Sequence, residues 1–169
     1  MKCNIDHSKK IVVMKKINIY YNLSQMVAMP SGYYYFGGYD MKQKEIMVLM
    51  VEPGKHPKVT TIKNDLDSLQ KAVSIGCEQQ GLIEIVGIED RVCILCNEEG
   101  KLIGLEGNRR LGNDILVGVF YVVGEDGRGN LVSLPDEAIE RYSKLFWPPE
   151  TFTPDEIANS VYAFFHDGW

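Results

Sequence analysis

Apolar and polar positions alternate with two different periods after residue 45, and these periods predict a mixture of strands and helices. Strands are predicted where β-branched or apolar residues form short continuous or alternating runs. Five such runs occupy residues 46–51, 58–62, 82–88, 91–96 and 115–123, and shorter candidates lie at 101–105 and 131–133. The run Ile115–Val123 is the longest, so we expect it to form a central strand.

Apolar residues at helical spacing predict three helices. Asn64 or Asp65 is the expected N-cap of a helix that ends near Ile75, and Gly76 is its expected stop. The other two helices are predicted at 135–146 and from the Thr153-Pro154 pair onward, where Pro occupies the first helical position. We therefore expect an α+β fold, with a mixed, largely antiparallel sheet of about five to seven strands and helices on one face.

Composition and charge narrow the class of protein. The chain has 169 residues, of which 45% are hydrophobic and 24% charged, values typical of a globular domain. Its net charge of −5 disfavours binding to nucleic-acid backbones, which needs a cationic surface. No apolar run approaches the roughly 18 residues of a membrane span, and no cleavable signal pattern is present. We therefore expect a cytoplasmic protein with no membrane contact and no cofactor.

The first 40 residues differ from the rest of the chain. They hold five Lys, two Asp and six of the nine Tyr, so their net charge is positive while the remainder is strongly acidic. Gly37-Gly38 can be encoded by a ribosome-binding sequence shortly before the codon of Met41. One hypothesis is that Met41 is the native start; the alternative is a natural leader. The expected organisation is a doubtful leader at 1–40, one α+β domain at 41–147 and a helical tail at 148–169.

Four blocks of the chain, in order, carry a resemblance to a known family. They are Val51–Lys55, Asn64–Gln70, Cys96–Lys101 and Asn108–Leu111. These blocks resemble an uncharacterised domain-of-unknown-function family found in phages and conjugative elements of mainly Gram-positive bacteria, over about residues 46–147. The resemblance implies an accessory protein of a mobile element and supplies no catalytic residues.

The Asn108-Arg109-Arg110 segment is the strongest candidate for ligand binding. It lies between Gly107 and Gly112, so we expect a loop whose backbone a ligand can approach. Adjacent arginines can offer bidentate hydrogen bonds to a phosphate or carboxylate. The alternative is that these arginines pair with nearby acids or lie in a solvated loop.

Two further segments hold residues with chemical potential. Glu52 and Lys55 follow the first predicted strand. Glu52 and His56 are residue types that can perform acid–base catalysis. A turn with exposed charges is the favoured interpretation. Cys93 and Cys96 are three positions apart in a predicted strand, so they point to opposite faces and are too distant for a disulfide or a shared metal. We therefore predict structural cysteines and no metal site.

The sequence favours a binding protein over an enzyme, because no catalytic constellation is visible. The expected partner is a host protein or an anionic, phosphorylated small molecule, for instance a nucleotide signal that the protein sequesters. The candidate binding residues are Asn108, Arg109, Arg110, Glu52 and Lys55. The alternative is a small nucleotide-acting hydrolase that uses Glu52, His56 and the arginines. A homodimer through an exposed strand edge stays open.

Overall fold

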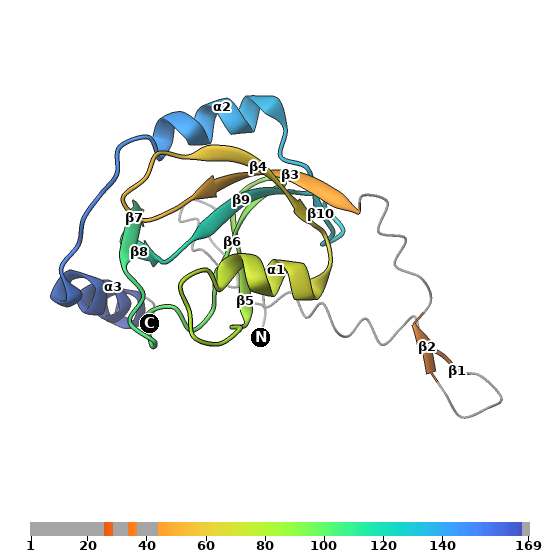
Figure 1. The fold of residues 1–169 in the computed structure, drawn as a ribbon, viewed down its shortest axis with the longest axis horizontal. Helices are drawn as coiled ribbons and strands as arrows, with labels where there is room; N and C mark the ends of the chain where they lie inside the picture. The colour runs from red at the N-terminus through yellow and green to blue at the C-terminus, as the bar shows by residue number, and fades with distance from the viewer. Residues whose placement is uncertain (1–25, 29–33, 37–43, 167–169) are drawn as a thin grey trace, which may run out of the picture.

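The computed structural model describes residues 26–28, 34–36 and 44–166, with side-chain surroundings for 44–160 (Figure 1). The doubtful start at Met41 lies outside the described residues. The strands are β1 (Met26–Ala28), β2 (Tyr34–Phe36), β3 (Glu45–Val51), β4 (Lys58–Lys63), β5 (Ile83–Glu89), β6 (Val92–Asn97), β7 (Gly107–Leu111), β8 (Asp114–Val117), β9 (Phe120–Glu125) and β10 (Leu131–Val132). The helices are α1 (Leu66–Val73), α2 (Asp136–Leu145) and α3 (Pro154–His166).

Six strands form one antiparallel sheet with the order β4-β3-β9-β6-β5, and β10 pairs with the part of β9 that follows its pairing with β3. Two hairpins, β3–β4 and β5–β6, are joined through the central strand β9. β7 and β8 form a separate two-stranded sheet, as do β1 and β2. The expected α+β class and the largely antiparallel sheet are therefore confirmed.

The central strands β3, β6 and β9 of the six-stranded sheet are buried on both faces. One face packs against α2 through Ala138, Tyr142 and Phe146, and Phe146 meets Phe120 edge to face at 5.2 Å between ring centroids. The other face packs against α1 through Leu69 and Val73. The expectation that the helices share one face is wrong, because β3, β6 and β9 are apolar at successive positions. A strand that is apolar on both sides needs cover on both sides, so α1 and α2 lie on opposite faces, as Figure 1 shows.

The two cysteines of the CxxC motif follow the alternation of β6. Cys93 belongs to the core on the α1 face and Cys96 to the core on the α2 face, and both are free thiols. Burial raises the pKa of Cys93 to about 12 and raises the pKa of Cys96 as well, so both remain protonated. The prediction of structural cysteines on opposite faces is confirmed.

The long apolar run Ile115–Val123 is two strands rather than one. Gly118 interrupts it with a φ of +63°, so the chain turns from β8, which pairs with β7, into β9, which enters the main sheet. The short strand expected at 101–105 is also wrong, since this segment forms turns that place Leu105 against Gly118. A count of apolar residues cannot detect such a break, because the glycine is itself compatible with an apolar run.

The helix starts agree with the predicted capping residues. The Asp65 carboxylate accepts a hydrogen bond from the Ser68 N–H at 2.9 Å, which caps α1. Thr153 and Glu156 form a reciprocal pair at the start of α3, with Thr153 N–H donating to the Glu156 carboxylate at 2.8 Å. In the part of the chain that the structure describes, no helix is long and apolar enough to cross a membrane.

Gly118 is a position where we expect a side chain to be destabilising. Its positive φ disfavours any L-residue, and an added Cβ would lie 2.6 Å from a Leu105 methyl carbon. We expect Gly118→Ala to lower the free energy of unfolding by about 1–3 kcal/mol, measured by urea denaturation. Gly87→Ala is the matched control, because nothing lies within 4 Å of its added Cβ. Equal stability of the two variants would contradict the assigned turn.

Candidate functional site

Arg109 lies inside the molecule, with 1% of its surface exposed. Its Nε donates to the Phe146 carbonyl at 2.9 Å, and its Nη2 donates to the Lys55 carbonyl at 2.7 Å. Its Nη1 donates to the backbone and side-chain oxygens of Asn108 at 2.8 and 2.9 Å. The guanidinium therefore joins β7 to the C-terminal end of α2 and to the β3–β4 turn.

Asn108 extends the same network. Its side-chain amide donates to the Val51 carbonyl at 3.0 Å and to the Gly118 carbonyl at 2.6 Å. The register of β7 against β8 shifts between Gly107 and Arg109. A bulge of this kind re-aims the neighbouring side chains, which lets two consecutive residues, Asn108 and Arg109, both face the interior.

Arg110 points away from this network. Its backbone N–H donates to the Glu150 carboxylate at 3.0 Å, and its guanidinium lies 5.3 Å from the centre of the Phe152 ring. The expected loop at 108–110 is wrong, since these residues belong to β7. Because the two arginines diverge, they do not converge on one anion. Binding of an anion by Asn108, Arg109 and Arg110 together therefore lacks the geometry that the sequence suggested.

The structure does bring Arg109 to two other predicted site residues, Glu52 and Lys55. The Glu52 carboxylate pairs with Lys55 and with Lys58, each at 2.8 Å, and its side chain is 14% exposed. The two lysines lower the pKa of Glu52 below its usual value. Both lysine side chains remain more than half exposed, so their ammonium groups lie at the surface.

His56 and Trp147 form an exposed stack beside these lysines. Their ring centroids are 4.3 Å apart and their planes differ by 14°. His56 Nδ1 lies 2.7 Å from the Trp147 carbonyl, so this nitrogen carries the proton of the hydrogen bond. Arg109 and His56 thus satisfy the carbonyls of Phe146, the C-cap of α2, and of Trp147, which follows it. We call the surface formed by Glu52, Lys55, His56, Lys58 and Trp147 the turn–helix site.

Two open hollows flank α2. The first, about 410 Å³ in volume, lies beside Trp147 and is completed by Glu140, Ser143 and Lys144. The second, about 700 Å³, lies between α2 and the end of β5 and includes the ion pair of Arg141 with Glu89. Neither hollow includes Arg109, Lys55 or Lys58 among its lining residues. Of the turn–helix site, Trp147 lines the first hollow, whereas Glu52, Lys55, His56 and Lys58 line neither of the two.

The chemistry of a hydrolase is poorly matched by these groups. Both oxygens of Glu52 are held in ion pairs, and a carboxylate with a lowered pKa is a weak proton acceptor. One ring nitrogen of His56 is committed to the end of α2. Among the residues that the structure describes, no group of three or more His, Cys, Asp or Glu side chains could hold a metal ion.

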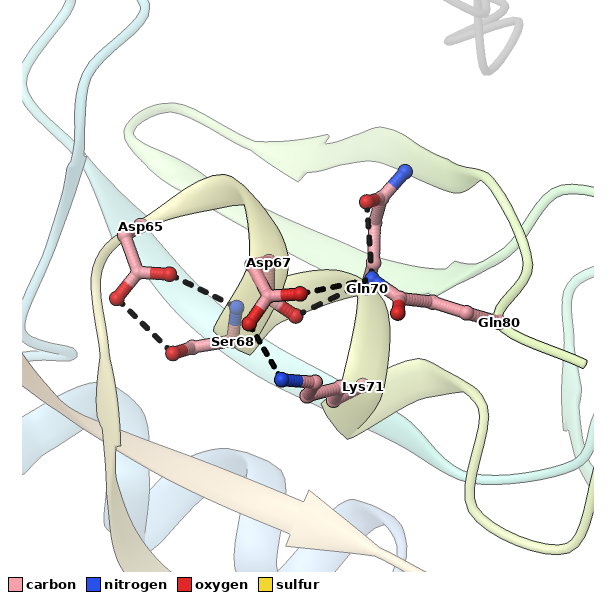
Figure 2. Close-up of polar contacts among 6 residues, drawn as sticks. All are labelled: Asp65, Asp67, Ser68, Gln70, Lys71 and Gln80. Atoms are coloured by element: carbon pink, nitrogen blue, oxygen red, sulfur yellow. Dashed lines mark hydrogen bonds and ion pairs between the residues drawn. The ribbon is translucent and has the colours of Figure 1, made fainter.

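A polar network at α1 has a structural explanation (Figure 2). The Gln80 side-chain amide donates to the Gln70 side chain at 3.1 Å and lies at 3.4 Å from the Asp67 carboxylate. Asp67 also pairs with Lys71 at 2.5 Å. These contacts hold the connection between α1 and β5 against the exposed side of the helix. They give each of these polar side chains a partner within the cluster.

The geometry defines a small α+β domain in which one antiparallel sheet lies between two helices and a buried arginine joins sheet, turn and helix end. The chain belongs to the DUF3846 family, a domain of unknown function, and the match covers residues 44–147. This match confirms the resemblance to a domain of unknown function over nearly the same residues. No curated protein and no solved structure matches the chain.

Sequence reasoning missed Lys58 and Trp147 as members of the site. Lys58 begins a strand and Trp147 follows a helix, so in the sequence each is simply a residue at the end of a predicted element. The contact between His56 and Trp147, which are 91 positions apart, brings Trp147 to the turn that precedes Lys58. A tryptophan immediately after an amphipathic helix, where it is not needed for the apolar stripe, was the one available signal.

We expect Arg109→Ala to be strongly destabilising. The change removes the donors of the Phe146 and Lys55 carbonyls and leaves these groups unpaired in the interior, at a cost of about 3 kcal/mol or more. Arg110→Ala is the matched control, and its exposed cation–π contact should contribute only about 0.5–1 kcal/mol. Both values can be measured by urea denaturation. A stable Arg109→Ala variant would show that Arg109 is free for a ligand.

We expect the stabilisation that Glu52 contributes to depend on pH. Its pKa is lowered in the folded protein, so its contribution is present above the unfolded pKa and is lost as the pH falls through the folded value. Glu52→Gln should therefore lower stability at neutral pH by about 0.5–1 kcal/mol, because the partner lysines are largely solvated. The difference between wild type and variant should shrink as the pH falls below the usual pKa of a glutamate, and it should vanish below the lowered pKa of the folded protein. A difference that grows on acidification would contradict the assigned ion pairs.

Proposed function

We propose that this protein acts by binding and that the turn–helix site contacts an acidic segment of a partner protein. The observation that carries the proposal is the local charge. Lys55 and Lys58 share a single carboxylate, and Arg109 forms no salt bridge within 4.0 Å among the described residues. Positive charge thus collects at this surface in a chain whose net charge is −5, which favours an anionic partner.

The position of these lysines supports a protein partner over a phosphorylated small molecule. Sites for small molecules are usually concave and enclose most of the ligand, whereas Lys55 and Lys58 line neither of the two hollows beside α2. Trp147 is 54% exposed and its neighbour Leu145 is 57% exposed. Tryptophan is enriched among the few residues that supply most of the binding energy at protein interfaces.

The family resemblance supports the biological setting of the proposal. Relatives that the four sequence blocks resemble occur in phages and conjugative elements, so we propose an accessory protein of such an element that works in the cytoplasm of its host. Its partner is then a host protein. Sequestration of a nucleotide signal is the small-molecule form of the same binding function, and the experiment below separates the two.

We expect Lys55→Glu combined with Lys58→Glu to abolish partner binding without unfolding the domain, because both side chains are more than half exposed. The immobilised full chain is incubated with host lysate, and retained proteins are quantified by mass spectrometry. Lys71→Glu is the matched control, since this exposed lysine lies on α1. Retention that is lost only in the double variant supports the proposal.

The same proteins retained by all variants would contradict the proposal. In parallel, wild type is heated with ATP, GTP and cyclic dinucleotides, and the melting temperature is recorded. A shift in melting temperature that the double variant removes would assign the site to a phosphorylated small molecule instead of a protein.

A further inference from the structure

β4 is the end strand of the six-stranded sheet, and one of its edges pairs with no other strand of the described residues (Figure 1). Its six residues pair with β3 in continuous register without a bulge. The opposite end strand, β5, has a register shift between Gly87 and Glu89. Because bulges hinder the addition of a further strand, β4 is the more regular of the two edges.

The pairing of β3 identifies the main-chain groups that face outward from β4. Met47 directs its N–H to the Ser133 hydroxyl and its carbonyl to the Leu134 N–H, so its main chain points away from β4. Met47 is opposite Thr61, and this pair is therefore not hydrogen-bonded. By the alternation of an antiparallel ladder, the N–H and carbonyl groups of Val59, Thr61 and Lys63 point to the free edge.

These three residues are exposed as well as outward-facing. Val59 is 49% exposed, and the side chains of Thr61 and Lys63 are exposed as well. Val59 lies opposite Leu49, which belongs to the core on the α2 face, so the side chain of Val59 is on the same face as α2. An added strand would therefore find main-chain partners at three alternate residues and one apolar side chain beside α2.

The charges at the edge distinguish between possible occupants. Lys58 and Lys63 occupy the two ends of β4, and Lys55 lies in the turn that precedes it. A second copy of this chain, paired antiparallel through β4 about Thr61, would bring four lysines to one two-stranded seam. Edge lysines disfavour such self-pairing, whereas an acidic segment would place opposite charges across the strands, which is favourable.

We propose that the acidic segment of the partner binds in an extended conformation as an added strand on the free edge of β4. Its main chain exchanges hydrogen bonds with Val59, Thr61 and Lys63, and its carboxylates lie near Lys58 and Lys63. From Val59 the bound segment continues along the β3–β4 turn toward Trp147. This inference rests on the proposed function and specifies how the turn–helix site recognises its partner.

The test uses displayed random peptides of about 12 residues, twice the length of a typical strand, selected against the immobilised full chain. We expect the enriched peptides to be acidic with alternating β-branched residues. Their affinity is then measured by fluorescence anisotropy for two matched variants. Thr61→Pro removes the outward N–H at a position where an edge strand tolerates proline, and Thr61→Val changes the side chain but keeps the N–H.

The expected result is that Thr61→Pro weakens binding roughly tenfold or more, while Thr61→Val stays close to wild type. Should Thr61→Pro fail to fold, amide hydrogen exchange of the wild type gives the same answer. Bound peptide should slow exchange at Val59, Thr61 and Lys63, whose N–H groups otherwise face solvent.

Several outcomes would overturn the inference. Acidic peptides that bind Thr61→Pro as tightly as wild type but lose affinity for the Lys55→Glu, Lys58→Glu double variant would leave the proposed function standing and remove strand addition. Peptides that are unaffected by both changes would remove both proposals. Enrichment of no acidic peptide, or a concentration-dependent dimer in sedimentation that Thr61→Pro abolishes, would also contradict an acidic strand as the occupant.

Discussion

The buried guanidinium of Arg109 is the interaction on which the arrangement of this domain depends. It supplies donors to three separate segments: β7 itself, the β3–β4 turn and the C-cap of α2. A hydrophobic residue of similar volume could fill the space but would leave the carbonyls of Lys55 and Phe146 without partners. A positive charge at the C-terminal end of a helix is also favourable to the helix dipole. Burial lowers the pKa of Arg109, with Glu150 acting in the opposite direction, and an arginine retains its charge under such conditions.

The separate β7–β8 hairpin makes this network possible. The main sheet is covered by α1 on one face and α2 on the other, and the guanidinium that reaches both the turn after β3 and the end of α2 comes from this hairpin. Gly118 turns the chain out of β8 and into β9, and the bulge at Gly107 aims both Asn108 and Arg109 inward. The positive surface at Lys55 and Lys58 is therefore held from beneath by residues that the sequence places more than 50 positions away.

The sequence predicted local features well and long-range ones poorly. The caps at Asp65 and Thr153, the strands around Cys93 and the turn after Gly124 follow from residue preferences within a few positions, and the structure confirms them. The division of Ile115–Val123 at Gly118 could not be predicted, because it depends on contact with Leu105 and on pairing with β7. The candidate site was identified in part: Glu52, Lys55 and Arg109 do come together, but the role of Arg109 was not visible. Whether an arginine lies in solvent or in the interior is decided by carbonyls that belong to distant segments.

The position of the binding surface follows from the distribution of apolar residues across the sheet. β3, β6 and β9 are apolar on both faces and their side chains are buried in the two cores, so a partner cannot contact them. β4 has the sequence Lys-Val-Thr-Thr-Ile-Lys, in which Ile62 alone packs against the core on the α1 face. A strand with so few core contacts keeps its place through its hydrogen bonds to β3, and its outer edge stays available. The lysines at the two ends of β4 repel a second copy of the same strand but attract an acidic strand. The charges that protect this edge from self-association therefore also define the charge of a partner that could bind there.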